Sequence, residues 1–214
     1  QPGENFLSHL KDNGVSYIEV RLLDVNPFEP SGIRLSQIDF LDLLLMYCLL
    51  SDSPQHDAST CEAVTTNFMR TVYEGRKPDL KLDKDGADIK LVEWAKQIFD
   101  ELRSFAEVFD RVTNSHRYTQ SLDFHYELIT DSQLTPSGRV LAHLQNTTES
   151  YKDFSLRQAE NHKNYFSQLP LTTKETESFK KVSAQSVETA ASHAASTPAD
   201  FRQYAADFQA AYRS

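Results

Sequence analysis

Hydrophobic and polar residues alternate along Val15–Asp24, near the start of the chain. Because successive side chains of a strand point to opposite faces, this alternation predicts a strand with one apolar face and one charged face. The apolar face would hold Ile18, Val20 and Leu22, and the other face Tyr17, Glu19, Arg21 and Leu23. From the alternation alone, the favoured interpretation is an exposed Glu19–Arg21 pair on a half-solvated sheet, since buried unpaired charge is costly.

The segment after this strand, Asn26–Gly32, contains two prolines and a glycine, so it predicts a shaped loop. Beyond it, apolar residues recur at helical spacing. The run Ile38–Leu50 is apolar almost all round, which predicts a central core helix buried on most sides. Further helices are expected over residues 5–12, 59–74, 89–112, 118–129, 136–144 and 174–195, in a polar, helix-prone stretch from Ser150, and from Thr197-Pro198 through Tyr212.

Residues 80–86 are expected to form a polar, charged loop. Asp83-Lys84-Asp85-Gly86 is similar to the start of a calcium loop, but Ala87 and Trp94 stand where the next ligand and the closing acid are required. The sequence therefore argues against a calcium site.

Composition and charge narrow the classes of protein. With 214 residues and 24.4 kDa, the chain can bury one sizeable core. The net charge of -9 and the pI near 5.2 argue against a nucleic-acid surface. No apolar run approaches the roughly 18 residues of a membrane span, and no signal peptide is recognisable, so we expect a cytoplasmic protein without membrane contact.

Cysteines and histidines add no motif of their own. Cys48 and Cys61 lack the CxxC spacing of zinc or thioredoxin sites, and buried free thiols are expected. A disulfide between them stays open if their helices double back on each other. The histidines show neither HExxH spacing nor a triad arrangement, and no glycine-rich phosphate loop is present.

Several motifs together resemble one family, the proteobacterial class of glutamate–cysteine ligase, also called gamma-glutamylcysteine synthetase. The resemblance rests on Tyr17-Ile18-Glu19-Val20-Arg21, Leu23 through Phe28, Pro30, Gly32, Phe40 through Leu43, Cys48, Asp52-Ser53-Pro54, Asn67, Arg70, Glu74 through Pro78, Leu80 and Leu134–Leu141. It covers most of this chain, but only about the C-terminal two-fifths of a typical family member. Leu22, in place of a small polar residue, and a divergent tail of about sixty residues depart from the family pattern.

The resemblance implies an α+β fold that is mostly α in this segment. One or two strands would belong to an antiparallel sheet of the glutamine synthetase/guanido kinase type, followed by a helical bundle. Residues 1–34 would complete the catalytic sheet, residues 35–147 would form a helical core, and residues 148–214 a helical extension. The N-terminal part of the same ligase, absent here, is then the expected protein partner, and this segment alone should be inactive.

The resemblance also implies the chemistry and the site. The ligase uses ATP and Mg²⁺ to join L-glutamate to L-cysteine through gamma-glutamyl phosphate, the first step of glutathione synthesis. Glu19 occupies the position of a magnesium ligand, and Arg21 that of a catalytic arginine that binds the transferred phosphate. Asn26 is a further candidate ATP contact. Two alternatives stay open: a non-catalytic helical regulatory or interaction module, and a related carboxylate–amine ligase with another amine acceptor.

Overall fold

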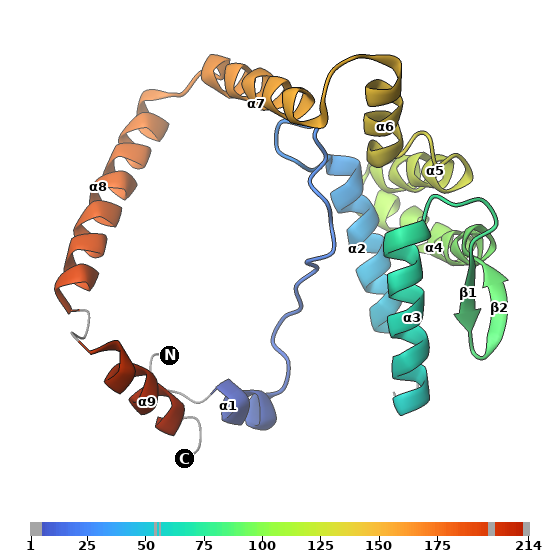
Figure 1. Ribbon diagram of the computed structural model, residues 1–214, viewed down its shortest axis with the longest axis horizontal. Helices are drawn as coiled ribbons and strands as arrows, with labels where there is room; N and C mark the ends of the chain where they lie inside the picture. Colours follow the sequence, from blue (N-terminus) through green and yellow to red (C-terminus); the bar gives the residue numbers. More distant parts are fainter. Residues whose placement is uncertain (1–5, 54, 56, 197–199, 212–214) are drawn as a thin grey trace. The chain divides into compact units, whose positions relative to one another are not determined.

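The computed structural model describes residues 6–53, 55, 57–196 and 200–211, and within them the chain is mostly helical with one two-stranded antiparallel sheet (Figure 1). The predicted fold class is thereby confirmed. The elements are α1 Phe6–Asn13, α2 Leu35–Leu50, α3 Ala58–Glu74, β1 Lys81–Lys84, β2 Ala87–Lys90, α4 Leu91–Thr113, α5 Arg117–Thr130, α6 Pro136–Asn146, α7 Tyr151–Gln168, α8 Thr173–Ser196 and α9 Phe201–Ala211. Predictions for Asn5, Pro54, His56, Thr197, Pro198 and Tyr212 lie outside the described residues.

The core lies where α2, α4 and α5 pack side by side (Figure 1). Its side chains come from these three helices, and the leucines Leu43, Leu102 and Leu122 are as fully buried as Ala106. The other buried core members are Phe99, Ala106 and Tyr118. Phe40 of α2 stacks between the rings of Phe99 and His125, at centroid distances of 5.2 and 4.7 Å. The apolar stripe of α4 from Ile98 to Phe109 therefore packs in the core, as its spacing predicts.

The corner between α4 and α5 is held by a buried carboxylate. Asn114 adopts a left-handed conformation and ends α4. Asp110, in the last turn of α4, accepts hydrogen bonds from the backbone N–H groups of Tyr118 and Thr119, at 2.8 and 3.1 Å. Asp110 therefore satisfies donors at the start of α5, where the N-cap His116 makes no side-chain capping bond.

Residues 80–86, expected as a polar loop, instead contain β1 and the turn of the β1–β2 hairpin, so that expectation is wrong. The helix expected from residue 89 begins at Leu91, because Ile89 and Lys90 belong to β2. Asp85 and Gly86 have φ values of 56° and 82°, which is the backbone of a two-residue type I′ turn. The strands pair with Leu82 opposite Ile89 and with Lys84 opposite Ala87. Leu82 is only 8% exposed, and Lys84 lies over the Trp94 ring, 5.6 Å from its centroid, so the hairpin is attached to α4 as well as to α3.

The strand expected over Val15–Asp24 is not formed in the described chain. These residues have no regular secondary structure, and the described strands are only β1 and β2. A strand exists only when another strand pairs with its backbone groups, and no such partner lies beside this segment in the described residues. The predicted alternation concerns side-chain faces and does not by itself supply that partner.

Two predictions of burial are also corrected. Helix α2 buries only Asp39 and Leu43, while Leu49 and Leu50 near its end are 73% and 65% exposed. This helix is covered on the side that faces α4 and α5, so it is not enclosed on most sides by the described residues. Cys48 and Cys61 are exposed free thiols, because both lie on helix surfaces outside the core.

The chain divides into two compact units, residues 25–167 and residues 1–24 with 168–214. The first unit contains the helical core and the hairpin, and the second contains α1, α8 and α9. The division into residues 1–34, 35–147 and 148–214 stays a prediction. Among the described residues, none of the helices has the length and apolar character needed to cross a membrane.

Candidate functional site

The segment that carries Glu19 and Arg21 is extended and exposed. Every residue from Leu10 through Val25 is exposed, and the apolar side chains Ile18 and Leu22 are 67% and 73% exposed. Folded proteins rarely leave a contiguous run of apolar side chains in water unless something binds there. An exposed segment with alternating faces has the pattern of a strand that joins an existing sheet edge.

Glu19 and Arg21 contact each other. The Arg21 guanidinium donates to the Glu19 carboxylate through Nε and also pairs with it through Nη2. The side chains are 45% exposed for Glu19 and 82% for Arg21, so the pair faces solvent. This is the exposed Glu–Arg pair that the alternation predicts. Such a pair contributes only about 0–1 kcal/mol, so both groups can exchange it for stronger partners at little cost.

Asn26 has a structural role in the loop that follows. Its side-chain Oδ1 accepts the Phe28 backbone N–H at 3.1 Å, and its own N–H donates to the Gly32 carbonyl at 2.8 Å. The residue is 8% exposed. Gly32 has φ +74°, and a Cβ there would lie 3.1 Å from Cγ1 of Val25, so this turn favours glycine. Contact of Asn26 with ATP stays a prediction.

Metal binding depends on the oxygen ligands that the chain offers. Within the described residues, no group of three or more His, Cys, Asp or Glu side chains is placed to hold a metal ion. Glu19 offers a solvent-accessible carboxylate, which suits Mg²⁺ because this ion is bound by one or two carboxylates together with phosphate and water. By its chemistry and exposure, Glu19 could supply one carboxylate ligand to such an ion, and its metal role stays a prediction.

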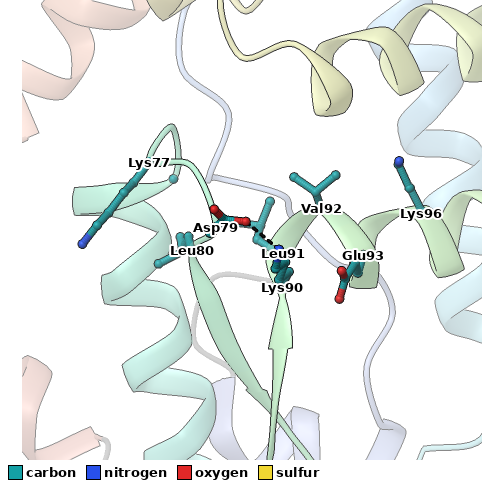
Figure 2. A pocket seen from close by; sticks show the side chains of 9 residues that line it. Lys77, Asp79, Leu80, Lys90, Leu91, Val92, Glu93 and Lys96 are labelled. Carbon is teal, nitrogen blue, oxygen red and sulfur yellow. Dashed lines mark hydrogen bonds and ion pairs between the residues drawn. The ribbon is translucent and has the colours of Figure 1, made fainter.

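A pocket of about 290 Å³ lies where the hairpin meets the start of α4 (Figure 2). Lys90 and Asp79 face each other across it, and the Lys90 Nζ donates to Asp79 Oδ1 at 2.6 Å. This contact lowers the pKa of Asp79 and raises that of Lys90. Lys77 points away from the pair (Figure 2). The ion pair thus satisfies both groups without a ligand.

A second pocket, of about 490 Å³, lies between α3 and the hairpin and is lined partly by Asn67 and Trp94. Asn67 donates through Nδ2 to the Asp83 carbonyl at 2.7 Å and accepts the Asp83 N–H at 2.8 Å. Arg70 and Arg76 bond to the Lys81 carbonyl and to Gln133 Oε1, both at 3.4 Å. These motif residues make contacts that stabilise the fold.

A cluster of charged side chains between α6 and α7 is not predicted from the sequence. Glu149 bonds His143 Nε2 at 2.6 Å, and it bonds Arg157 through Nε at 2.9 Å and through Nη2 at 2.8 Å. Phe154, 2% exposed, lies beside His143 with 5.2 Å between ring centroids. The sequence offers no spacing signal for this cluster, because its residues stand 6 to 14 positions apart and join α6 to α7. The presence of an acidic and two basic side chains is the only hint that the sequence contains.

The chain is similar in sequence to proteins of one named family. The model of a family described as glutamate-cysteine ligase matches residues 1–71. A protein named glutamate–cysteine ligase from Pseudomonas putida is 39% identical over 185 residues, which are 86% of this chain and 35% of the relative. One from Janthinobacterium is 41% identical over 185 residues, with the same shares of 86% and 35%. One from Pseudomonas fluorescens is 36% identical over 208 residues, 97% of this chain and 39% of the relative.

A solved structure is similar as well. The crystal structure of glutamate–cysteine ligase from Francisella tularensis in complex with AMP matches with a TM-score of 0.84 and 26% sequence identity. The match covers 100% of this chain and 41% of that one. The predicted resemblance is thus confirmed, and the chain spans 35–39% of the length of the relatives from Pseudomonas and Janthinobacterium.

Proposed function

We propose, on the premise that this chain resembles the C-terminal segment of glutamate–cysteine ligase, that it is one part of an ATP-dependent enzyme of that kind. The enzyme would transfer the γ-phosphoryl group of ATP to the side-chain carboxylate of L-glutamate, releasing ADP. The amine of L-cysteine would then attack the acyl carbon, and phosphate would leave. The product, gamma-glutamylcysteine, is the first intermediate of glutathione synthesis, and we assign the enzyme to the cytoplasm.

The observation that carries this proposal is the exposed, alternating segment that presents Glu19 and Arg21 together. In the part of the chain that the structure describes, no strand pairs with its backbone, and this backbone and the exposed apolar face are what a strand needs to add to a sheet supplied by the rest of a longer chain. The AMP complex of the Francisella tularensis enzyme supports a nucleotide as one ligand of the proposed site. The upstream part of the ligase is then the partner that covers this segment.

Glu19 would act as one ligand of Mg²⁺. A bound magnesium ion would offset negative charge on the ATP phosphates and help orient them for transfer. The Glu19 carboxylate is accessible and shares only an exposed contact with Arg21, so it can turn to an ion. Because a single carboxylate is a weak magnesium site, the remaining protein ligands would come from the upstream part of the enzyme.

Arg21 would bind the phosphoryl group during its transfer. A planar guanidinium can donate two parallel hydrogen bonds to phosphate oxygens, and these bonds strengthen as charge develops on the oxygens. At 82% exposure, the Arg21 side chain is free to reach a bound phosphate when Glu19 engages a cation. Asn26 remains our candidate for the nucleotide edge, although its Oδ1 already holds the turn.

Substitution of the two charged residues in the full-length ligase tests the proposal. Glu19→Gln keeps the shape and removes the charge, and it should raise the Mg²⁺ concentration needed for half-maximal rate. Arg21→Ala should lower kcat by about 10²–10³-fold, the usual cost of removing one such charge-stabilising donor. Circular dichroism would check that both variants fold, and an exposed pair that contributes about 0–1 kcal/mol predicts that they do.

Arg103→Gln is a matched control, because Arg103 forms a comparable surface ion pair with Asp123 at 2.6 Å. Full turnover in both Glu19→Gln and Arg21→Ala would favour the non-catalytic helical module instead. Activity with another amine in place of cysteine, at a higher kcat/KM, would favour the related carboxylate–amine ligase. Each outcome is read from phosphate release with a set of amino acid acceptors.

A further inference from the structure

The loop Asn26–Ile33, directly after the segment that carries Glu19 and Arg21, is folded tightly on itself. Asn26 N–H donates to the Gly32 carbonyl at 2.8 Å, and Glu29 N–H donates to the Asn26 carbonyl at 3.2 Å. Gly32 N–H returns a bond to the Glu29 carbonyl at 2.9 Å. With the bond from Phe28 N–H to Asn26 Oδ1, the loop has a single defined shape at the point where the segment ends.

Helices α6 and α7 hold this loop from outside. The Arg139 guanidinium lies over the Phe28 ring, 3.9 Å from its centroid, and Phe154 meets the same ring edge to face at 5.9 Å. Gln158 Nε2 donates to the Pro27 carbonyl at 2.8 Å, across 131 positions of sequence. We call this set, Phe28, Arg139, Phe154 and Gln158, the clamp.

The clamp is itself supported by the cluster described above. Phe154 lies against His143, and the Arg157 guanidinium lies 5.5 Å from the Phe154 ring centroid. Glu149 bonds both His143 and Arg157, so it joins the end of α6 to the first turns of α7. At the other end of the loop, Glu29 pairs with Arg34 at 2.6 Å. The loop is therefore fixed at both ends and over its middle.

Fixing the loop has a consequence for the residues just before it. Arg21 precedes Asn26 by five positions, so if the segment pairs as a strand, about 17 Å of extended chain separate the two residues and a displacement of Asn26 would move Arg21 along the strand. A register shift of one residue would turn Glu19 and Arg21 to the opposite face. We propose that the clamp is a positioning device that sets the register in which this segment joins the catalytic sheet, and this rests on the function proposed above.

Kinetics of the full-length ligase test the proposal. Phe28→Leu and Arg139→Gln each remove the stacked contact without touching Glu19 or Arg21. We expect kcat to fall by about 10- to 100-fold, the effect of misplacing a reacting group by about 1 Å. The conservative variant Phe28→Tyr keeps the aromatic ring and should therefore retain the original kcat. Arg103→Gln again serves as the control and should leave kcat unchanged.

Two further readouts separate positioning from a loss of structure. Hydrogen exchange of the 26–33 peptide should accelerate in Phe28→Leu, while the thermal midpoint moves by only a few degrees. In an Arg21→Lys background, where phosphate binding is already impaired, Phe28→Leu should add little further loss, because both changes act on the same contact.

The outcomes distinguish this inference from the proposed function. If Glu19→Gln and Arg21→Lys impair turnover but Phe28→Leu does not, although its loop exchanges faster, the clamp has no positioning role. The same conclusion holds if the fold-losses in kcat of the single variants Phe28→Leu and Arg21→Lys multiply fully in the double variant. If Glu19→Gln and Arg21→Lys both leave turnover intact, the proposed function itself is wrong.

Discussion

Among single residues, Glu149 shows clearly how neighbours set an ionisation. Its carboxylate accepts two hydrogen bonds from Arg157 and one from His143. These contacts, with that of Arg157 the largest, lower the pKa of Glu149 to about 2. Asp39 shows the opposite case, since burial raises its pKa although Arg117 pairs with it at 2.7 Å. The difference follows from exposure, because Asp39 is only 2% exposed.

Glu149→Gln should lower stability in a way that depends on pH. The folded pKa lies below the unfolded one, so Glu149 stabilises the fold above about pH 4.5, and this contribution is lost as pH falls toward about 2. The urea midpoint of Glu149→Gln should therefore lie below that of the original chain at pH 7, and the two should converge in acid. Glu160→Gln, an exposed change on α7, should show neither effect. A difference between the two urea midpoints that does not change with pH would contradict the stabilising role of the ionised Glu149 carboxylate.

The sequence could predict individual residues only as far as local pattern reaches. It predicts that Glu19 and Arg21 share a face, and the structure has them in contact. It does not predict the Asp39–Arg117 pair or the pairing of Gln158 with Pro27, because these join residues that only the folded chain brings together. The expected burial of Cys48 and Cys61 was wrong because thiol chemistry alone does not decide which helix face is covered.

At the scale of elements, the hairpin shows what the pattern does not reveal. Strands of four residues are too short for a clear alternation, and Lys81 stands opposite Lys90 and Asp83 opposite Asp88, an unfavourable pairing of like charges. The diagonal Lys81–Asp88 contact at 3.4 Å and the Lys90–Asp79 pair offset part of that repulsion. The turn signal was present in Asp85-Gly86, which favours a type I′ hairpin.

Asn67→Ala should weaken the attachment of this hairpin to α3. The change removes both side-chain bonds to the Asp83 backbone and should lower the free energy of unfolding by about 1–3 kcal/mol, the cost of leaving backbone groups unsatisfied. Hydrogen exchange of the peptide covering residues 81–90 should accelerate. Thr65→Ala, which removes an exposed hydroxyl on the same helix, is the control and should change neither quantity. Unchanged exchange of this peptide in Asn67→Ala would show that α3 does not hold the hairpin.

The helices were easier to predict than the strands. Each helix satisfies its own backbone groups, so spacing in the sequence suffices to locate it, as it does for α4 and for the Thr135-Pro136 start of α6. The segment Val15–Asp24 has the alternation of a strand, but its backbone partner would have to come from another strand. The alternation of apolar and charged side chains can therefore be present although the segment forms no hydrogen bonds with a neighbouring strand.

At the scale of the whole molecule, the amount of exposed apolar surface fits a chain that is one part of a larger enzyme. Phe179, Phe201 and Leu171 are 62%, 76% and 59% exposed, in addition to the apolar residues of the extended segment. The relatives from Pseudomonas and Janthinobacterium are much longer, since this chain spans 35–39% of their length. We infer that the remaining length of such an enzyme covers part of this surface.

The chain by itself should be inactive. In the proposed site, Glu19 and Arg21 would supply one metal ligand and one phosphate contact, and the described residues hold no group of three or more possible ligands that could form a metal site. Purified residues 1–214 should therefore release no phosphate from ATP in the presence of glutamate, cysteine and Mg²⁺. Phosphate release above the level of an Arg21→Ala chain would contradict the division of the site between two parts of the enzyme.

Trp94 gives the molecule an internal optical reporter. It is the single tryptophan of the sequence, and it lies on α4 beneath Lys84 of the hairpin. Its fluorescence should respond to the cation above its ring and so follow the detachment of the hairpin, whereas far-ultraviolet circular dichroism follows all the helices. If the two signals change at the same urea concentration, the hairpin and the helical core unfold as one cooperative unit. An earlier fluorescence change would mark the hairpin as a separate unit of lower stability.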